Sequence, residues 1–103
     1  MKLEAGMYAR TLNGIVKIDK IQDNVMKDTK GHLHYGDFDK ASYKIIDILE
    51  VGDYVNGVEV IDIDDEWITM SDTLPILKSI ANGLIKSILT KEQFESMSYK
   101  LED

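Results

Sequence analysis

Two runs rich in β-branched residues meet at an Asn-Gly pair in the middle of the chain, and this pair constrains the fold more than any other feature. The first run ends at Val55, Asn56-Gly57 follow, and the second run covers Val58–Ile63. Asn and Gly accept the positive φ angles of a two-residue turn, so the pair is the strongest short-range sign of a β-hairpin. A polar turn at residues 64–66 then leads into a predicted return strand, Trp67–Met70.

The N-terminal half carries weaker signals of the same kind. A second turn signal, Asn13-Gly14, precedes Ile15–Ile21, where apolar and polar residues alternate as in a half-buried strand. Short strands are also predicted at Val25-Met26, ending at Asp28, and around His32–Tyr35. In the stretch Ser42–Leu49, the apolar spacing fits a helical face but the β-branched content favours an extended segment, which is the prediction made.

The last third of the sequence predicts the only regular helix. A single helical turn is expected around Leu77–Ala81, followed by a strand over Leu84–Leu89. Thr90 and Gln93 then form a Thr-x-x-Gln capping box, which marks the start of a two-turn helix. Its expected apolar stripe is Phe94 with Met97, and the tail Tyr99–Leu101 is interpreted as a final strand.

These elements predict a mainly β fold, a small SH3-like or OB-like barrel or roll with one short C-terminal helix. The 103 residues favour one domain, 1–103. The chain is 44% apolar and 30% charged, which indicates a globular protein. It has no Cys, which excludes disulfides, thiolate metal sites and Cys nucleophiles. No signal peptide and no membrane span are expected, so we predict a cytoplasmic protein.

The charge is strongly negative and unevenly distributed. The net charge is −7, which argues against a protein that holds nucleic acid with clustered Lys and Arg. The window Ile45–Leu77 contains no Lys or Arg. Its nine acids are Asp47, Glu50, Asp53, Glu59, Asp62, Asp64, Asp65, Glu66 and Asp72. The run is either a solvated surface that maintains solubility or a negative patch that meets a basic partner.

The residue patterns favour neither a metal nor catalysis. His32 and His34 would project from one strand face, but a third ligand would have to come from Asp37 or Asp39. Asp62, Asp64 and Glu66 alternate like the start of a calcium loop, but Trp67 and Thr73 stand where that loop needs Gly and Glu. We therefore predict no catalytic residues, no metal ligands and no cofactor.

Trp67 is the only Trp in the sequence. If strict alternation holds, Trp67 shares a strand face with Ile61 and Ile63, which predicts that it lies in the core. The alternative is an exposed aromatic anchor beside the acidic turn, an arrangement typical of binding hot spots. Tyr54, next to Asp53 in the first hairpin, is a second candidate anchor.

The runs Ala41–Gly57 (with IIDILEVGDYVNG) and Ile85–Glu95 (IKSILTKEQFE) resemble segments of small phage and prophage proteins of Gram-positive bacteria. The resemblance covers about residues 41–103. Many members of that family have a longer insert where this chain has the compact connection Ser71–Gly83. The resemblance supplies no catalytic residue. It implies a setting in which small acidic accessory proteins, including anti-CRISPR proteins, bind and inhibit host proteins.

From the charge and this resemblance we expect a non-enzymatic, phage-encoded protein that docks an acidic surface on a host protein with a basic surface, such as a defence nuclease. We expect a monomer in the host cytoplasm that contacts neither membrane nor nucleic acid directly. Two alternatives stay open: a homo-oligomer that sequesters a small nucleotide signal through Arg10, or a phage assembly protein. The predicted partner-binding residues are Asp53, Tyr54, Glu59, Asp62, Asp64, Asp65 and Glu66.

Overall fold

A computed structural model describes residues 3–35, 38 and 40–97. Backbone contacts divide the chain into two compact units, residues 1–11 with 15–49 and residues 12–14 with 50–103. The sequence-based prediction of one domain over residues 1–103 stays a prediction. Within the described ranges, every helix is too short or too polar to span a bilayer.

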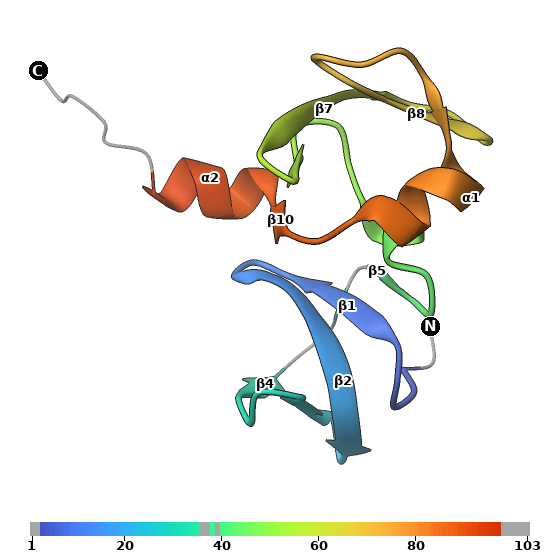
Figure 1. Cartoon of the computed structure of the whole chain (residues 1–103). Helices are drawn as coiled ribbons and strands as arrows, with labels where there is room; N and C mark the ends of the chain where they lie inside the picture. The colour runs from blue at the N-terminus through green and yellow to red at the C-terminus, as the bar shows by residue number, and fades with distance from the viewer. Residues whose placement is uncertain (1–2, 36–37, 39, 98–103) are drawn as a thin grey trace, which may run out of the picture. The chain divides into compact units, whose positions relative to one another are not determined.

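The first unit is built on a five-stranded sheet in the order β4-β3-β2-β1-β5 (Figure 1). Its pairs β1–β5, β2–β3 and β3–β4 are antiparallel. The strands are β1 (Tyr8–Thr11), β2 (Gly14–Gln22), β3 (Val25–Asp28), β4 (Leu33–Tyr35) and β5 (Lys40–Ser42). The strands predicted near residues 15–21, 25–28 and 32–35 are thus confirmed.

The core of this unit follows from the alternation in its strands. Ile18 of β2 and Met26 of β3 are buried together with Ala9 of β1. Their neighbours in sequence, such as Lys17 and Lys27, lie on the solvent side. Since side chains alternate across a strand, one sheet face carries the core and the other faces water.

The extended segment predicted over Ser42–Leu49 is wrong, because residues Ile45–Ile48 form the 3₁₀ helix η1. The Ser42 hydroxyl accepts the Lys44 N–H over 3.1 Å and donates to Asp47 over 2.9 Å. Such local side-chain bonds favour a turn over a strand. The turn buries Ile46 and Ile48, so tertiary packing outweighs the β-branched preference.

The second unit contains another five-stranded sheet, in the order β10-β6-β7-β8-β9. Each of these neighbouring pairs is antiparallel. The strands are β6 (Tyr54–Val55), β7 (Val58–Ile63), β8 (Trp67–Met70), β9 (Ile76–Leu77) and β10 (Ile88–Leu89). Its helices are α1 (Lys78–Ala81), the 3₁₀ helix η2 (Asn82–Leu84) and α2 (Lys91–Met97). The predicted strand Leu84–Leu89 is therefore confined to its last two residues.

The predicted Asn-Gly hairpin is confirmed. Asn56 and Gly57 both have positive φ, 52° and 83°, as a primed two-residue turn between β6 and β7 requires. The Asn56 side chain does more than turn the chain. Its Oδ1 accepts the N–H groups of Lys86 and Ser87 over 2.8 and 3.1 Å, which holds the segment before β10.

The capping box of α2 is also confirmed. The Gln93 N–H donates to the Thr90 hydroxyl over 3.2 Å, and the Thr90 N–H donates to Gln93 Oε1 over 3.0 Å. Phe94 and Met97, which the sequence identifies as the apolar stripe of this helix, are exposed. The Phe94 ring instead stacks on Tyr54, with 5.0 Å between centroids. The strand predicted over Tyr99–Leu101 lies outside the described residues.

The mainly β class and the short C-terminal helix are confirmed. Each sheet ends in two edge strands, β4 and β5 in the first and β10 and β9 in the second. Neither sheet closes on itself within the described residues, so each is compatible with a barrel-like roll rather than a closed barrel.

Candidate functional site

The hairpin β7–β8 of the second unit contains a bulge that decides which side chains face solvent. Val60 pairs with Met70, but Asp62 pairs with Thr69, so two steps along β7 match one step along β8. A bulge of this kind shifts the alternation by one residue. Val60 and Ile68 lie in the core, whereas Ile61 and Asp62 are both exposed.

The prediction that Trp67 lies in the core is wrong, because 40% of its surface is exposed. Strict alternation carried through the turn placed Trp67 on the face of Ile61 and Ile63, but Ile63 pairs with Ile68, so Trp67 lies opposite Asp64 on the other face. Ile68 occupies the core position instead. The structure therefore shows the alternative arrangement, an aromatic side chain at the surface beside the acidic turn.

Trp67 lines an open groove of about 480 Å³ on this hairpin. Leu74 and Pro75, from the segment between β8 and β9, also line it, and Leu74 is 84% exposed. The lining residues are Asp62, Asp64, Trp67, Thr69, Leu74 and Pro75. An exposed Trp and an exposed Leu therefore lie with two carboxylates at one groove.

Asp64 fixes the position of the Trp67 backbone. Its Oδ1 accepts the N–H groups of Glu66 and Trp67 over 3.0 and 2.8 Å, which forms an Asx turn. The Asp64 N–H donates to the Trp67 carbonyl over 3.0 Å, so the two residues lie opposite each other. By contrast, the carboxylate of Asp62 has no partner in the part of the chain that the structure describes.

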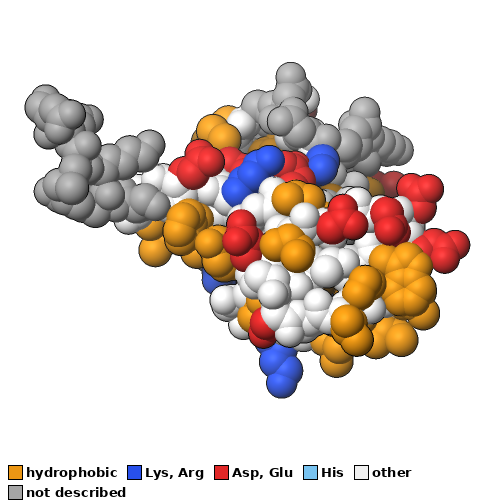
Figure 2. All heavy atoms as spheres, turned by 90° about the horizontal axis from the view of Figure 1, so that it is seen from above, with side chains coloured by type: hydrophobic (Ala, Val, Ile, Leu, Met, Phe, Trp, Pro, Cys, Tyr) orange, Lys and Arg blue, Asp and Glu red, His pale blue; other side chains and the backbone are white. Residues whose placement is uncertain are grey.

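Four predicted site residues, Asp62, Asp64, Asp65 and Glu66, therefore gather at the end of β7–β8. All four side chains are exposed. Figure 2 shows acidic side chains beside a group of apolar ones on a face that includes this hairpin. We call these four acids with Trp67 and Leu74 the hairpin face.

Asp53 is not part of the hairpin face, which corrects the sequence-based assignment. Its exposure is 0%, and its Oδ2 accepts the Glu50 N–H over 2.7 Å. Its Oδ1 accepts the Lys91 N–H at the start of α2 over 2.9 Å. A buried carboxylate that accepts two backbone N–H groups organises the fold.

Glu59 and Tyr54 lie on the preceding hairpin, where they pair directly across β6 and β7. Glu59 is exposed, whereas Tyr54 is half-buried and stacks on Phe94. Neither lines the groove beside Trp67. The structure thus separates these two predicted contact residues from the hairpin face.

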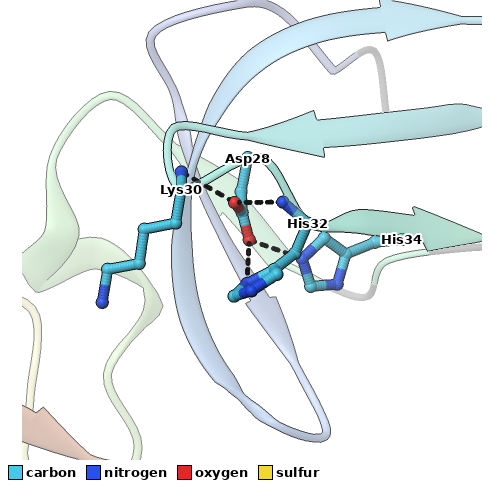
Figure 3. Close-up of polar contacts among 4 residues, drawn as sticks. All are labelled: Asp28, Lys30, His32 and His34. Carbon is cyan, nitrogen blue, oxygen red and sulfur yellow. Dashed lines mark hydrogen bonds and ion pairs between the residues drawn. The ribbon is translucent and has the colours of Figure 1, made fainter.

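The two histidines belong to a cluster around Asp28 on the β3–β4 hairpin (Figure 3). His34 Nε2 lies 2.8 Å from Asp28 Oδ2, and His32 Nδ1 lies 3.7 Å from the same oxygen. The N–H groups of Lys30 and His32 donate to Oδ1 over 2.9 and 3.0 Å. The hydrogen bond from His34, followed by those backbone donors, lowers the pKa of Asp28 to about 2 although burial opposes this.

This cluster replaces the metal arrangement considered for the histidines. Asp37 and Asp39 lie outside the described residues, and the carboxylate that meets both imidazoles is Asp28. No group of three or more His, Asp or Glu side chains within the described ranges is arranged to hold a metal ion. The cluster supports the turn between β3 and β4, and His34 is half-buried within it.

Arg10 lies inside the first unit, with little of its surface exposed. Its Nη1 donates to the Ile48 carbonyl over 3.1 Å, so it holds η1 in place. The guanidinium therefore serves the fold of that unit.

Comparison of the chain with protein-family models, curated proteins and solved structures finds no match. The resemblance carried by Ala41–Gly57 and Ile85–Glu95 consequently stays a prediction. The geometry of the hairpin face is therefore the main basis for assigning a function to this chain.

Proposed function

We propose that this protein is a non-enzymatic binding protein that docks its hairpin face on a basic surface of another protein. The observation that carries the proposal is the exposure of Trp67 between carboxylates at an open groove. Trp is enriched among residues that dominate binding energy, and charges around such an anchor speed encounter with an oppositely charged surface.

The charge of the second unit supports this proposal. Residues 12–14 and 50–103 contain twelve acidic and four basic side chains, whereas residues 1–11 and 15–49 contain seven and eight. The negative charge is thus concentrated in the unit that carries the groove. At physiological salt the attraction between exposed charges extends over about 8 Å. Such charges therefore act mainly while two proteins approach each other, and their main effect is on the association rate.

The biological setting rests on the resemblance to phage proteins. In that setting the partner is a host protein in the host cytoplasm, and an inhibitor of a defence nuclease is the form we favour. Carboxylates at the hairpin face would compete with nucleic-acid phosphates for the nuclease's Lys and Arg side chains. No enzymatic step is part of the proposal.

The nucleotide-sequestering alternative requires Arg10 to bind phosphate. Its burial and its bond to the Ile48 carbonyl count against that role. No specific observation favours a phage assembly protein, so the host-binding role is the one we propose.

The test begins with capture of partners from a Gram-positive host lysate and continues with kinetics on the purified partner. The variant Asp62→Asn, Asp64→Asn, Glu66→Gln removes three charges and keeps both shape and the Asx turn. A matched control, Asp19→Asn, Asp23→Asn, Glu95→Gln, removes three exposed charges elsewhere. Biolayer interferometry then gives association and dissociation rates at several salt concentrations.

We expect the hairpin variant to associate at least five-fold more slowly, while the control stays within two-fold of the wild type. Rising salt should slow the wild type more than the hairpin variant. If both variants associate at the wild-type rate at every salt concentration, the hairpin face serves solubility only and the proposed function is wrong.

A further inference from the structure

The groove on the hairpin face has an ordered arrangement of aromatic and acidic side chains. Asp62 of β7 lies opposite Thr69 of β8, and Asp64, the residue after β7, lies opposite Trp67, whose carbonyl accepts its N–H. Directly opposed residues point to the same sheet face, so both carboxylates share a face with the indole. Two residues along an extended strand span about 6–7 Å, which sets the spacing of the two acids.

The basic residue that follows this acidic segment in the sequence is Lys78, whose N–H donates to the Glu66 carbonyl over 2.8 Å. No Lys or Arg occurs between Ile45 and Leu77, and none lines the groove. Asp64 uses Oδ1 for its turn, and the Asp62 carboxylate has no partner within the described residues. A ligand for this groove must therefore combine positive charge with a part that packs on Trp67, Leu74 and Pro75.

We infer that the groove binds an arginine side chain of the partner protein, with the guanidinium stacked on Trp67 and hydrogen-bonded to Asp62 and Asp64. This inference rests on the proposed function and names the group that the hairpin face recognises. The occupant is one exposed Arg on a protein surface, and its aliphatic stem packs against Leu74 and Pro75.

The geometry favours arginine over lysine. A guanidinium is planar, stacks on an aromatic ring and presents several N–H donors in fixed directions, so one group can reach two carboxylates. A lysine ammonium is a compact, strongly hydrated charge that gains less from the ring face. The combination of one indole and two carboxylates therefore suits the flat cation better.

The experiment uses short blocked peptides and the protein's own fluorescence. Trp67 is the only Trp in the sequence, so its emission reports on this groove alone. Acetyl-Gly-Arg-Gly-amide is titrated into the full chain, alongside the matching lysine peptide and the neutral citrulline peptide. The NMR signal of the Trp67 indole N–H provides a second readout that does not depend on quenching.

We expect saturable binding of the arginine peptide with a Kd on the order of 1 mM. The lysine peptide should bind at least three-fold more weakly, and the citrulline peptide should give no saturable change. Asp62→Asn and Asp64→Asn should each weaken arginine binding at least three-fold. Asp65→Asn, which removes the same charge from an exposed residue outside the groove lining, should change it less than two-fold.

Equal binding of the arginine and lysine peptides would overturn the inference, and so would the absence of a peptide-dependent change in both signals. An equal effect of Asp65→Asn and Asp62→Asn would also overturn it, because long-range attraction would then explain the binding. These outcomes are separate from the proposed function, since a partner protein could still associate through the hairpin face without an arginine in the groove.

Discussion

His34 Nε2 lies 2.8 Å from Oδ2 of Asp28, a carboxylate that is only 2% exposed. The bond joins β4 to the end of β3, next to a turn whose N–H groups donate to the other carboxylate oxygen. The backbone N–H groups and the His34 ring all donate to the carboxylate of Asp28, so they favour its ionised form. The β3–β4 hairpin is therefore held by a group whose charge state depends on pH.

The first prediction concerns stability in acid. Asp28 has a pKa of about 2 in the folded chain against an ordinary value of 3.8. A lowered folded-state pKa gives stability that is present above pH 3.8 and is lost as the pH falls from 3.8 towards 2. Asp28→Asn should therefore lower the melting temperature at pH 7, and its difference from the wild type should shrink across that window.

Asp19→Asn is the matched control for this experiment, since Asp19 is an exposed residue of β2. Thermal melts followed by circular dichroism from neutral pH down to the folded-state pKa of Asp28, about 2, measure the effect. The melting temperatures of Asp28→Asn and the wild type could instead differ by the same amount at every pH. In that case the ionised carboxylate of Asp28 does not stabilise the fold.

The second prediction concerns Asp53, which sequence reasoning assigned to the binding surface. Asp53→Ala leaves the partly buried N–H groups of Glu50 and Lys91 without their acceptor, and an unsatisfied buried donor costs about 1–3 kcal/mol. We expect the free energy of unfolding to fall by about 2–4 kcal/mol, measured by urea denaturation. Asp65→Asn, at the surface, should stay within about 0.5 kcal/mol of the wild type.

Binding distinguishes the two interpretations of Asp53. Under conditions where the variant is folded, its affinity for the arginine peptide should equal that of the wild type. A stable Asp53→Ala protein with impaired partner binding would restore Asp53 to the contact surface.

The third prediction concerns the N-cap of α2. Thr90→Ala removes the hydroxyl that accepts the Gln93 N–H, which should lower the free energy of unfolding by about 1 kcal/mol. Thr90→Ser keeps the acceptor and should recover most of the loss. An alanine variant as stable as the serine variant would mean that the hydroxyl does not stabilise the helix.

The fourth prediction separates the two faces of β8. Trp67→Ala should lower the free energy of unfolding by less than Ile68→Ala does, because 40% of Trp67 is already exposed in the folded chain. Ile68→Ala removes a buried side chain and should cost about 2–5 kcal/mol. Partner binding should show the reverse order when both variants are folded, with Trp67→Ala the more impaired.

Signals confined to a few neighbouring residues were sufficient to predict part of this fold. The Asn56-Gly57 turn and the Thr90–Gln93 capping box depend on local backbone geometry, and the structure confirms both. The gathering of Asp62, Asp64, Asp65 and Glu66 also follows from their position in one hairpin turn. In each case the partner of a residue lies close to it along the chain.

Contacts over longer distances could not be predicted in the same way. The register of β7 against β8 pairs Ile63 with Ile68, and this pairing places Trp67 on the opposite face from the one that alternation predicts. The burial of Asp53 depends on Lys91, and no signal near Asp53 indicates that partner. The sequence could have indicated that the Asp28 side chain bonds to the backbone of the following turn. Its contact with His34, however, depends on the register of β3 against β4.

The bond between Asp53 and Lys91 also has a consequence for the order of folding during synthesis. It joins residues 38 positions apart, and the seven-residue helix α2 is too short to persist alone in water. Until residue 91 has left the ribosome, Asp53 lacks one of its two backbone donors and the helix lacks its anchor. The second unit therefore completes its folding only when residues 50–53 and 91 can meet, after residue 91 has left the ribosome.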